Sequence, residues 1–104
     1  MTTTYRTFKI QTANGPVDAE QYATFTRYIQ SEQFRFVVTR ETPLSPFVVT
    51  HRASGKKVAE ITHTELAACL NNKEDAGKLA LSKLIDRAGE ARVRSVLAAA
   101  EKAR

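Results

Sequence analysis

The chain has 104 residues, of which 42% are hydrophobic and 26% are charged, and it carries a net charge of +5 at pH 7. This length suits a single core, and the composition excludes collagen-like, low-complexity and disordered proteins. No apolar run approaches the ~20 residues of a membrane-spanning helix. We therefore expect residues 1–104 to form one small soluble domain with no membrane partner.

The chain contains one cysteine, Cys69, so no disulfide can form within it. Because disulfides are concentrated in oxidising compartments, a lone cysteine favours a reducing one. The first residues also lack the apolar stretch of a secretory signal peptide. Together these features predict a cytoplasmic protein.

The N-terminal third predicts a strand and then a helix. Polar and apolar side chains alternate from Tyr5 to Ile10, as in a half-buried strand, before the Asn14-Gly15-Pro16 run interrupts the pattern. Asp18 then provides a helix N-cap, and Gln21 completes a capping box. The apolar positions that follow share one helical face: Tyr22, Phe25 and Ile29. These signals predict a helix over about 19–31.

The middle of the chain predicts three more strands. Alternating apolar residues indicate strands over 34–39 and 47–52, separated by a proline-containing loop that a paired central strand would exclude. An Ala53-Ser54-Gly55 turn follows, in which Gly55 can adopt a positive φ. A return strand over 57–62 completes this hairpin.

The remaining residues predict three helices. Thr62 begins a capping box, which starts a helix over about 63–71. Asn72 caps the next helix, and Gly89 ends it. The last helix covers about 90–103. The expected order of elements is therefore β-α-β-β-β-α-α-α.

This order predicts an α+β fold, in which an antiparallel four-stranded sheet has helices packed on one face. Periodicity assigns a set of apolar side chains to the core between them: Phe34, Phe36, Phe47, Ile61, Leu66, Leu84, Ile85, Val93 and Leu97. The alternate strand positions would form an open face on the other side of the sheet: Arg35, Val37, Thr39, Val48, Thr50, Arg52 and Val58.

The sequence lacks the motifs of serine hydrolases, zinc proteases, phosphate-binding loops and paired-cysteine sites. Cys69 lies within a predicted helix, where a buried, unreactive thiol is more common than a nucleophile paired with histidine. His51 shares a strand face with apolar neighbours, which predicts a hydrogen-bonded histidine at a strand end. Because His51, His63 and Cys69 match no zinc spacing, we expect no metal, no cofactor and no catalytic residue. The sequence favours a binding protein over an enzyme.

Most of the positive charge is concentrated in one segment. Four of the five net charges fall within residues 35–57, which carry one acidic residue and five basic ones: Arg35, Arg40, Arg52, Lys56 and Lys57. A local charge excess can form a surface patch. Basic residues on a tight turn can bind phosphates, and a β-ribbon can enter a major groove. These five residues therefore predict a nucleic-acid-binding site.

Two other interpretations of this region stay open. The basic turn can be a solvated hairpin whose lysines discourage edge pairing. Alternatively, the chain is a protein-interaction module, such as a regulator, inhibitor or subunit, that uses an apolar strip of Val37, Val48 and Val58 on the open face. Arg35 and Arg52 beside that strip would attract an acidic protein partner. Base stacking on the sheet is not expected, because the aromatic residues of 34–39 are assigned to the core.

Overall fold

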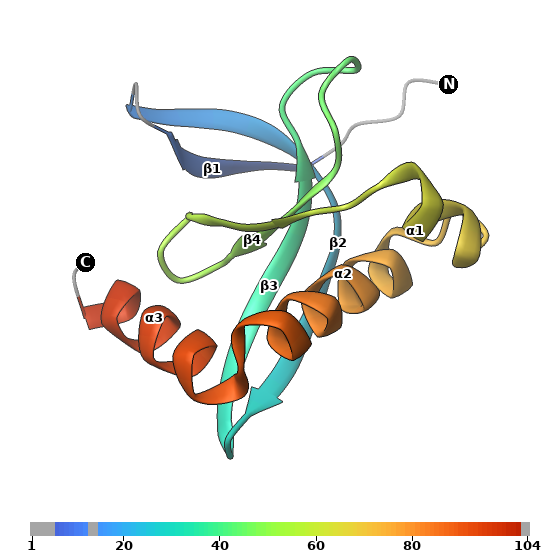
Figure 1. Cartoon of the computed structure of the whole chain (residues 1–104). Coiled ribbons are helices and arrows are strands. Elements are labelled where there is room, and N and C mark those ends of the chain that lie inside the picture. The colour runs from blue at the N-terminus through green and yellow to red at the C-terminus, as the bar shows by residue number, and fades with distance from the viewer. Residues whose placement is uncertain (1–5, 13–14, 103–104) are drawn as a thin grey trace.

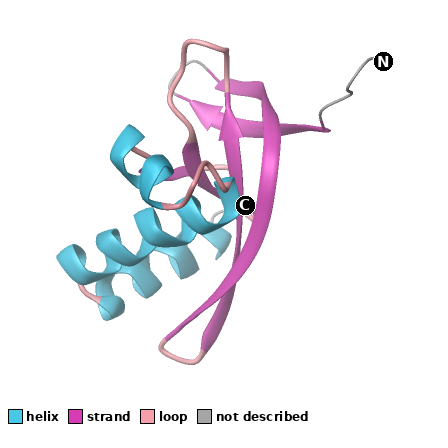
Figure 2. Cartoon of the chain, turned by 90° about the vertical axis from the view of Figure 1, so that its right-hand side faces the viewer, coloured by secondary structure: helices cyan, strands magenta, loops and turns pink. Residues whose placement is uncertain are grey.

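A computed structural model describes residues 6–12 and 15–102; Tyr5, Asn14 and residue 103, which enter the predictions above, lie outside these ranges. The chain folds as an antiparallel sheet followed by helices, which confirms the expected α+β class (Figure 1). The strands are β1 (Arg6–Thr12), β2 (Gly15–Ile29), β3 (Glu32–Arg40), β4 (Val48–His51) and β5 (Lys57–Glu60). The helices are α1 (His63–Ala68), α2 (Lys73–Ala88) and α3 (Glu90–Lys102). Figure 2 shows the helices on one side of the sheet.

Within the described residues, five strands form a meander in the order β1-β2-β3-β4-β5, each antiparallel to the next. β2 and β3 are the longest strands and form one hairpin. Gln30 and Ser31 connect them, and both have positive φ, 51° and 69°. Two-residue turns of this kind match the right-handed twist of the strands that they join. The β2–β3 hairpin is therefore the frame on which β1 and β4 pair from either side.

The helix predicted over 19–31 is wrong, because most of this segment belongs to β2. The sheet accordingly has five strands where four were expected, and all of them precede the helices. Asp18 does not cap a helix but pairs with Lys9 of β1, at 3.3 Å between charged atoms. β2 is rich in β-branched and aromatic residues: Thr24, Phe25, Thr26, Tyr28 and Ile29. Pairing with a strand on each side outweighs the local capping signal.

The main core lies between the sheet and the helices. Most of the residues expected there are buried: Phe34, Phe36, Ile61, Leu66, Ile85, Val93 and Leu97. The other two, Phe47 and Leu84, are partly buried and pack against the same cluster. Phe25 joins this core from β2 and stacks on Phe36, with ring centroids 5.4 Å apart. The face of the sheet that carries the core is therefore as predicted.

Part of the opposite face of the sheet is closed, although the sequence predicted an open face there. Val37, Thr39 and Thr50 are fully buried there, and Val48 is 7% exposed. Ile10 of β1 is also buried and lines the same hollow as Val48, so β1 lies over this part of the sheet. The predicted open face is therefore wrong for these four residues, whereas Arg35 and Arg52 are exposed as expected.

This part of the face closes because the sheet curls until β1 meets the β4–β5 turn. The pairing of β2 with β3 is irregular between Gln21 and Ala23, and such irregularities bend a strand and increase its twist. The N–H of Gln11 donates to the carbonyl of Gly55 at 2.8 Å, and Gln11 also forms an isolated parallel bridge with Lys56. The alternation of polar and apolar residues in the sequence does not reveal this curvature of the sheet.

The helices begin at their predicted caps. The Thr62 side chain accepts the N–H of Glu65 at 3.1 Å, and the Glu65 carboxylate accepts the N–H of Thr62 at 2.8 Å. Asn72 caps α2, and Gly89, with a φ of 92°, ends it. α1 ends at Ala68, earlier than expected. In the part of the chain that the structure describes, no helix is long and apolar enough to cross a membrane.

Candidate nucleic-acid interface

The predicted basic turn joins β4 to β5. Gly55 adopts a φ of 74°, which its lack of a side chain permits, and its N–H donates to the His51 carbonyl at 2.7 Å. The N–H of His51 donates to the Lys56 carbonyl at 2.8 Å and closes the turn. Arg52, Lys56 and Lys57 are exposed. The turn therefore presents three permanent cations to solvent.

This turn is anchored on both sides. On one side, the Gly55 carbonyl accepts the N–H of Gln11 from β1. On the other, the side chain of His51 is fully buried, with Nδ1 2.8 Å from Ser54 Oγ and Nε2 3.1 Å from Glu101 Oε1 of α3. The expected hydrogen-bonded histidine at a strand end is confirmed. A hairpin held between β1 and α3 does not project as a free ribbon, which disfavours insertion into a major groove.

Arg35 and Arg52 are neighbours on adjacent strands. The N–H of Arg52 donates to the Arg35 carbonyl at 3.0 Å, and both side chains are exposed. With Gln33, Ala53 and Glu101 they line a hollow of about 350 Å³. Among the described residues, neither guanidinium has a hydrogen-bonding or ion-pair partner. Two unpaired guanidinium groups side by side favour an anion between them.

Tyr28 of β2 is an exposed aromatic residue, with 67% of its surface accessible. Its two neighbours point toward the helices: Arg27 donates a hydrogen bond to Ser82 of α2, and Ile29 is 1% exposed. Because side chains alternate along a strand, the ring of Tyr28 lies on the opposite face of the sheet.

Strand pairing places Tyr28 near the two arginines. Tyr28 pairs with Gln33 and Thr26 pairs with Arg35, so Tyr28 and Arg35 are diagonal neighbours, about 7–8 Å apart and within reach of long side chains. We call the surface formed by Tyr28, Gln33, Arg35 and Arg52 the exposed sheet surface. An aromatic ring beside unpaired cations can stack a base while the cations contact its phosphates.

Tyr28 is absent from the predicted site residues because it lies within the segment expected to be a helix, about 19–31. In a strand, a period of two places Phe25 and Ile29 on one face and Tyr28 on the other. The β-branched and aromatic residues of 24–29 are the signal that could have revealed this. Phe34 and Phe36 are buried as expected and take no part in the exposed sheet surface.

Arg40, a member of the predicted set, lies apart from it. In an extended strand its position along β3 is about 16 Å from Arg35. Its guanidinium lies 4.5 Å from the ring centroid of Phe47 and 5.3 Å from that of Tyr22, and it donates to the Tyr22 hydroxyl at 2.9 Å. Burial and a hydrogen bond to Glu20 raise the pKa of Tyr22, although Arg40 opposes this effect. Arg40 therefore belongs to a packed aromatic cluster and not to the exposed sheet surface.

The apolar strip of the alternative hypothesis is not on the surface. Val37 and Val48 are buried, and Val48 lines one hollow with Ile10 of β1. Val58 is half-buried and packs against the core on the helix side. The register of β4 and β5 shifts between Val49 and Thr50, so simple alternation misplaces Val58. Val37, Val48 and Val58 therefore do not form one exposed interface.

The other candidate residues lie apart as well. His63 is exposed at the start of α1, and Cys69 is half-buried directly after that helix. Over the described ranges, no group of three or more His, Cys, Asp or Glu side chains is placed to hold a metal ion. His51, His63 and Cys69 therefore do not converge on one site.

No protein-family model, curated protein or solved structure matches this chain. What the exposed sheet surface can bind therefore follows from its own chemistry. It combines one accessible aromatic ring with two unpaired guanidinium groups, and Lys56 lies on the turn that follows Arg52. The acidic residue that lines its hollow, Glu101, is hydrogen-bonded to His51.

Proposed function

We propose that this chain is a small, non-enzymatic module that binds single-stranded nucleic acid on its exposed sheet surface. The observation that carries the proposal is the placement of Tyr28, which is 67% exposed, beside the unpaired side chains of Arg35 and Arg52. Stacking tolerates any sequence because every base has a π face, and the arginines can contact the backbone. Lys56 and Lys57 of the basic turn extend the positive surface.

Single strands fit this surface better than a duplex for two physical reasons. The bases of a duplex are stacked on each other, so none is free to stack on the ring of Tyr28. The β4–β5 turn is held by β1 and α3, so it lacks the freedom of a ribbon that enters a groove. Phosphate contacts from Arg35 and Arg52 supply attraction that depends on salt and not on sequence.

The test is a titration of fluorescein-labelled oligo-dT, oligo-rU and a duplex of equal length, followed by anisotropy at several salt concentrations. We expect tighter binding to the single strands and weaker binding as salt rises. The double variant Arg35→Ala, Arg52→Ala should lower the slope of log K against log salt by about 1.4, because each phosphate contact contributes about 0.7 for single strands.

The matched control is the double variant Arg87→Ala, Lys102→Ala, which removes the same charge from exposed positions on the helices. Its binding should stay close to that of the parent. The proposal fails if no oligonucleotide binds at low salt. It fails equally if the control variant loses as much affinity as the variant of the exposed sheet surface, since the attraction would then reflect net charge alone.

A further inference from the structure

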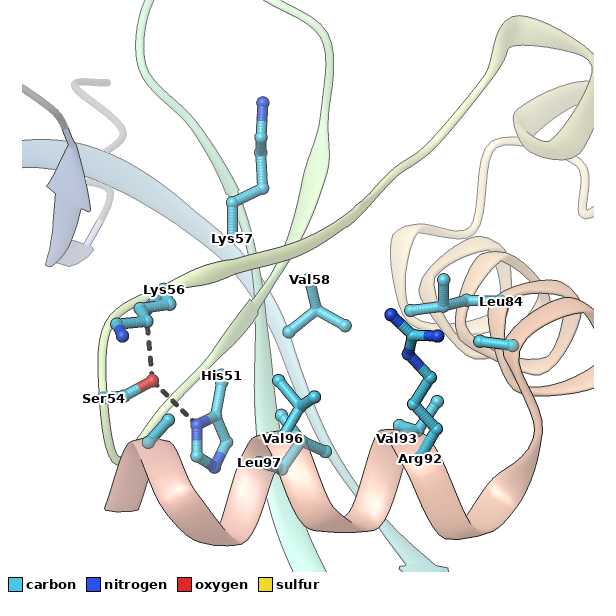
Figure 3. A pocket seen from close by; sticks show the side chains of 12 residues that line it. His51, Ser54, Lys56, Lys57, Val58, Leu84, Arg92, Val93, Val96 and Leu97 are labelled. Atoms are coloured by element: carbon cyan, nitrogen blue, oxygen red, sulfur yellow. Dashed lines mark hydrogen bonds between the residues drawn. The ribbon is translucent and has the colours of Figure 1, made fainter. Parts of the chain in front are cut away.

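A groove runs between the β4–β5 hairpin and helices α2 and α3 (Figure 3). Its volume is about 230 Å³, and most of its wall is apolar: Val58, Leu84, Val93, Val96, Leu97 and Ala100. Val96 is 60% exposed, although its helix buries Val93 and Leu97 against the core. The groove therefore leaves apolar surface that this chain does not fill, and such concave apolar surface is typical of small-ligand sites.

The charged residues that line the groove are all basic. They are Arg92 of α3 and the two lysines of the basic turn, and none of the 12 lining residues is acidic. Figure 3 shows Arg92 extending over the groove toward Leu84, whereas Lys57 points away from it. In the described part of the chain, Arg92 forms neither a hydrogen bond nor an ion pair. Its guanidinium is therefore available to an anionic ligand.

We propose that this groove binds an aliphatic carboxylate, with the hydrocarbon chain along Val58, Val93 and Val96 and the carboxylate on Arg92. A guanidinium can hold a carboxylate through two parallel hydrogen bonds, which fixes the orientation of the ligand. The groove is small, about 230 Å³, and suits a short aliphatic chain such as that of octanoate.

The dimensions favour a small molecule over a protein partner. A stable protein interface takes about 20–30 residues from each side, whereas 12 residues line this groove. The inference is independent of nucleic-acid binding, because Val58 faces the helices and Tyr28 lies on the opposite face of the sheet. Failure of one proposal therefore leaves the other standing.

The test is a titration of the isotope-labelled protein with octanoate, followed by backbone amide chemical shifts. We expect saturable shifts centred on Val58, Val93 and Val96. Hexanoate should bind about tenfold more weakly, because two fewer methylenes are buried. Octan-1-ol should bind more weakly than octanoate, and octyltrimethylammonium should not bind, because Arg92 repels its cation.

Two substitutions separate the head group from the chain. Arg92→Gln should weaken octanoate about tenfold and leave octan-1-ol unchanged, while the matched control Arg87→Gln on α2 changes neither. Val96→Asp should abolish octanoate binding, while Leu44→Asp, at a position 98% exposed and outside the groove, should not.

Three results would overturn the proposal. They are an absence of saturable shifts, equal binding of octyltrimethylammonium, and equal effects of Arg87→Gln and Arg92→Gln. Should Val96→Asp fail to fold, the ligand series and the arginine pair decide the question without it.

Discussion

The imidazole of His51 joins the β4–β5 turn to the last turn of α3 through Glu101, whose Oε1 lies 3.1 Å from Nε2. A carboxylate accepts hydrogen bonds, so in the neutral imidazole Nε2 carries the proton, and Nδ1 accepts from the Ser54 hydroxyl at 2.8 Å. The Ser54 oxygen accepts the N–H of Lys56 at 3.3 Å. A continuous series of hydrogen bonds therefore connects α3 to the basic turn.

Removing the Glu101 carboxylate should destabilise the fold measurably. Glu101→Ala leaves a buried Nε2–H without its partner, which should lower the free energy of unfolding by about 1–2 kcal/mol. Glu101→Gln keeps an acceptor oxygen and should cost less. The adjacent variant Lys102→Ala should change stability by under ~0.5 kcal/mol. Urea denaturation measures all three, and equal effects would show that the contact with His51 contributes nothing.

Replacement of Tyr28 tests the stacking component of the proposed function. Tyr28→Ala should weaken binding of oligo-dT about tenfold, and Tyr28→Trp should retain it, because stacking on an aromatic side chain contributes about 1–3 kcal/mol per base. Thermal unfolding should change little, since the ring is 67% exposed. If Tyr28→Ala binds as tightly as the parent, the ring is not part of the interface.

Arg40 and Arg52 should respond in opposite ways to the same substitution. Arg40→Gln removes a cation held near the rings of Phe47 and Tyr22, so it should lower the free energy of unfolding by about 1 kcal/mol and leave the salt dependence of binding unchanged. Arg52→Gln should leave stability unchanged and reduce the salt dependence. Denaturation and anisotropy on both variants check this pair. A lower salt slope for Arg40→Gln would return Arg40 to the interface.

Local signals in the sequence predict the helices well. The side chains of Thr62 and Asn72 cap helices that begin directly after them, because a cap depends on residues three positions apart. Asp18 carries the same type of signal, yet it lies in β2 opposite Lys9. Strand pairing joins residues far apart in the chain. A local sequence pattern therefore does not show whether strand pairing or a capped helix is more stable for this segment.

For the candidate site too, the sequence predicts the features that depend on local signals and not those that depend on contacts between strands. The exposure of Arg52 and Lys56 follows from a tight turn that the sequence marks with Gly55. The position of Arg40 depends on ring packing across strands, and charge alone does not reveal it. The segment of β2 was predicted to be a helix, and for that reason the exposed aromatic residue of the surface, Tyr28, was not predicted.

Acid should weaken the fold partly through Glu65. Burial alone raises the pKa of this carboxyl, but hydrogen bonds with Thr62 and the charge of Lys83, 3.4 Å away, outweigh burial and lower the pKa below 4.5. A carboxyl whose pKa is lower in the folded than in the unfolded state stabilises the fold at pH values above its unfolded-state pKa. That contribution is lost as the pH falls through the folded-state pKa.

The pH dependence should therefore differ between two glutamine variants. Glu65→Gln should be less stable than the parent near neutral pH, and the difference should shrink as the pH drops below 4.5. Glu74→Gln, at an exposed position 3.9 Å from Lys78, is the control and should show little pH-dependent difference. Urea denaturation of the parent and both variants, from neutral pH to below 4.5, measures these differences in stability. A constant gap between parent and Glu65→Gln would mean that the carboxylate charge is irrelevant.

Gly77 allows α2 to approach the sheet closely. A Cβ atom at this position would lie 2.8 Å from Cγ2 of Val38 and 2.9 Å from Cε1 of Phe25. Both neighbours are buried, and a branched side chain or a ring in a packed core has little room to move. Alanine is about 1 kcal/mol better than glycine in a helix, but overpacking costs about 1–3 kcal/mol.

We therefore expect Gly77→Ala to lower the free energy of unfolding by about 1 kcal/mol, although the higher helix propensity of alanine alone would raise it. In a Val38→Ala background the added methyl has space, so the same substitution should cost less there or even stabilise the fold. Urea denaturation of the parent, both single variants and the double variant gives the coupling between the two positions. If Gly77→Ala stabilises the parent by the full propensity gain, close packing does not explain this glycine.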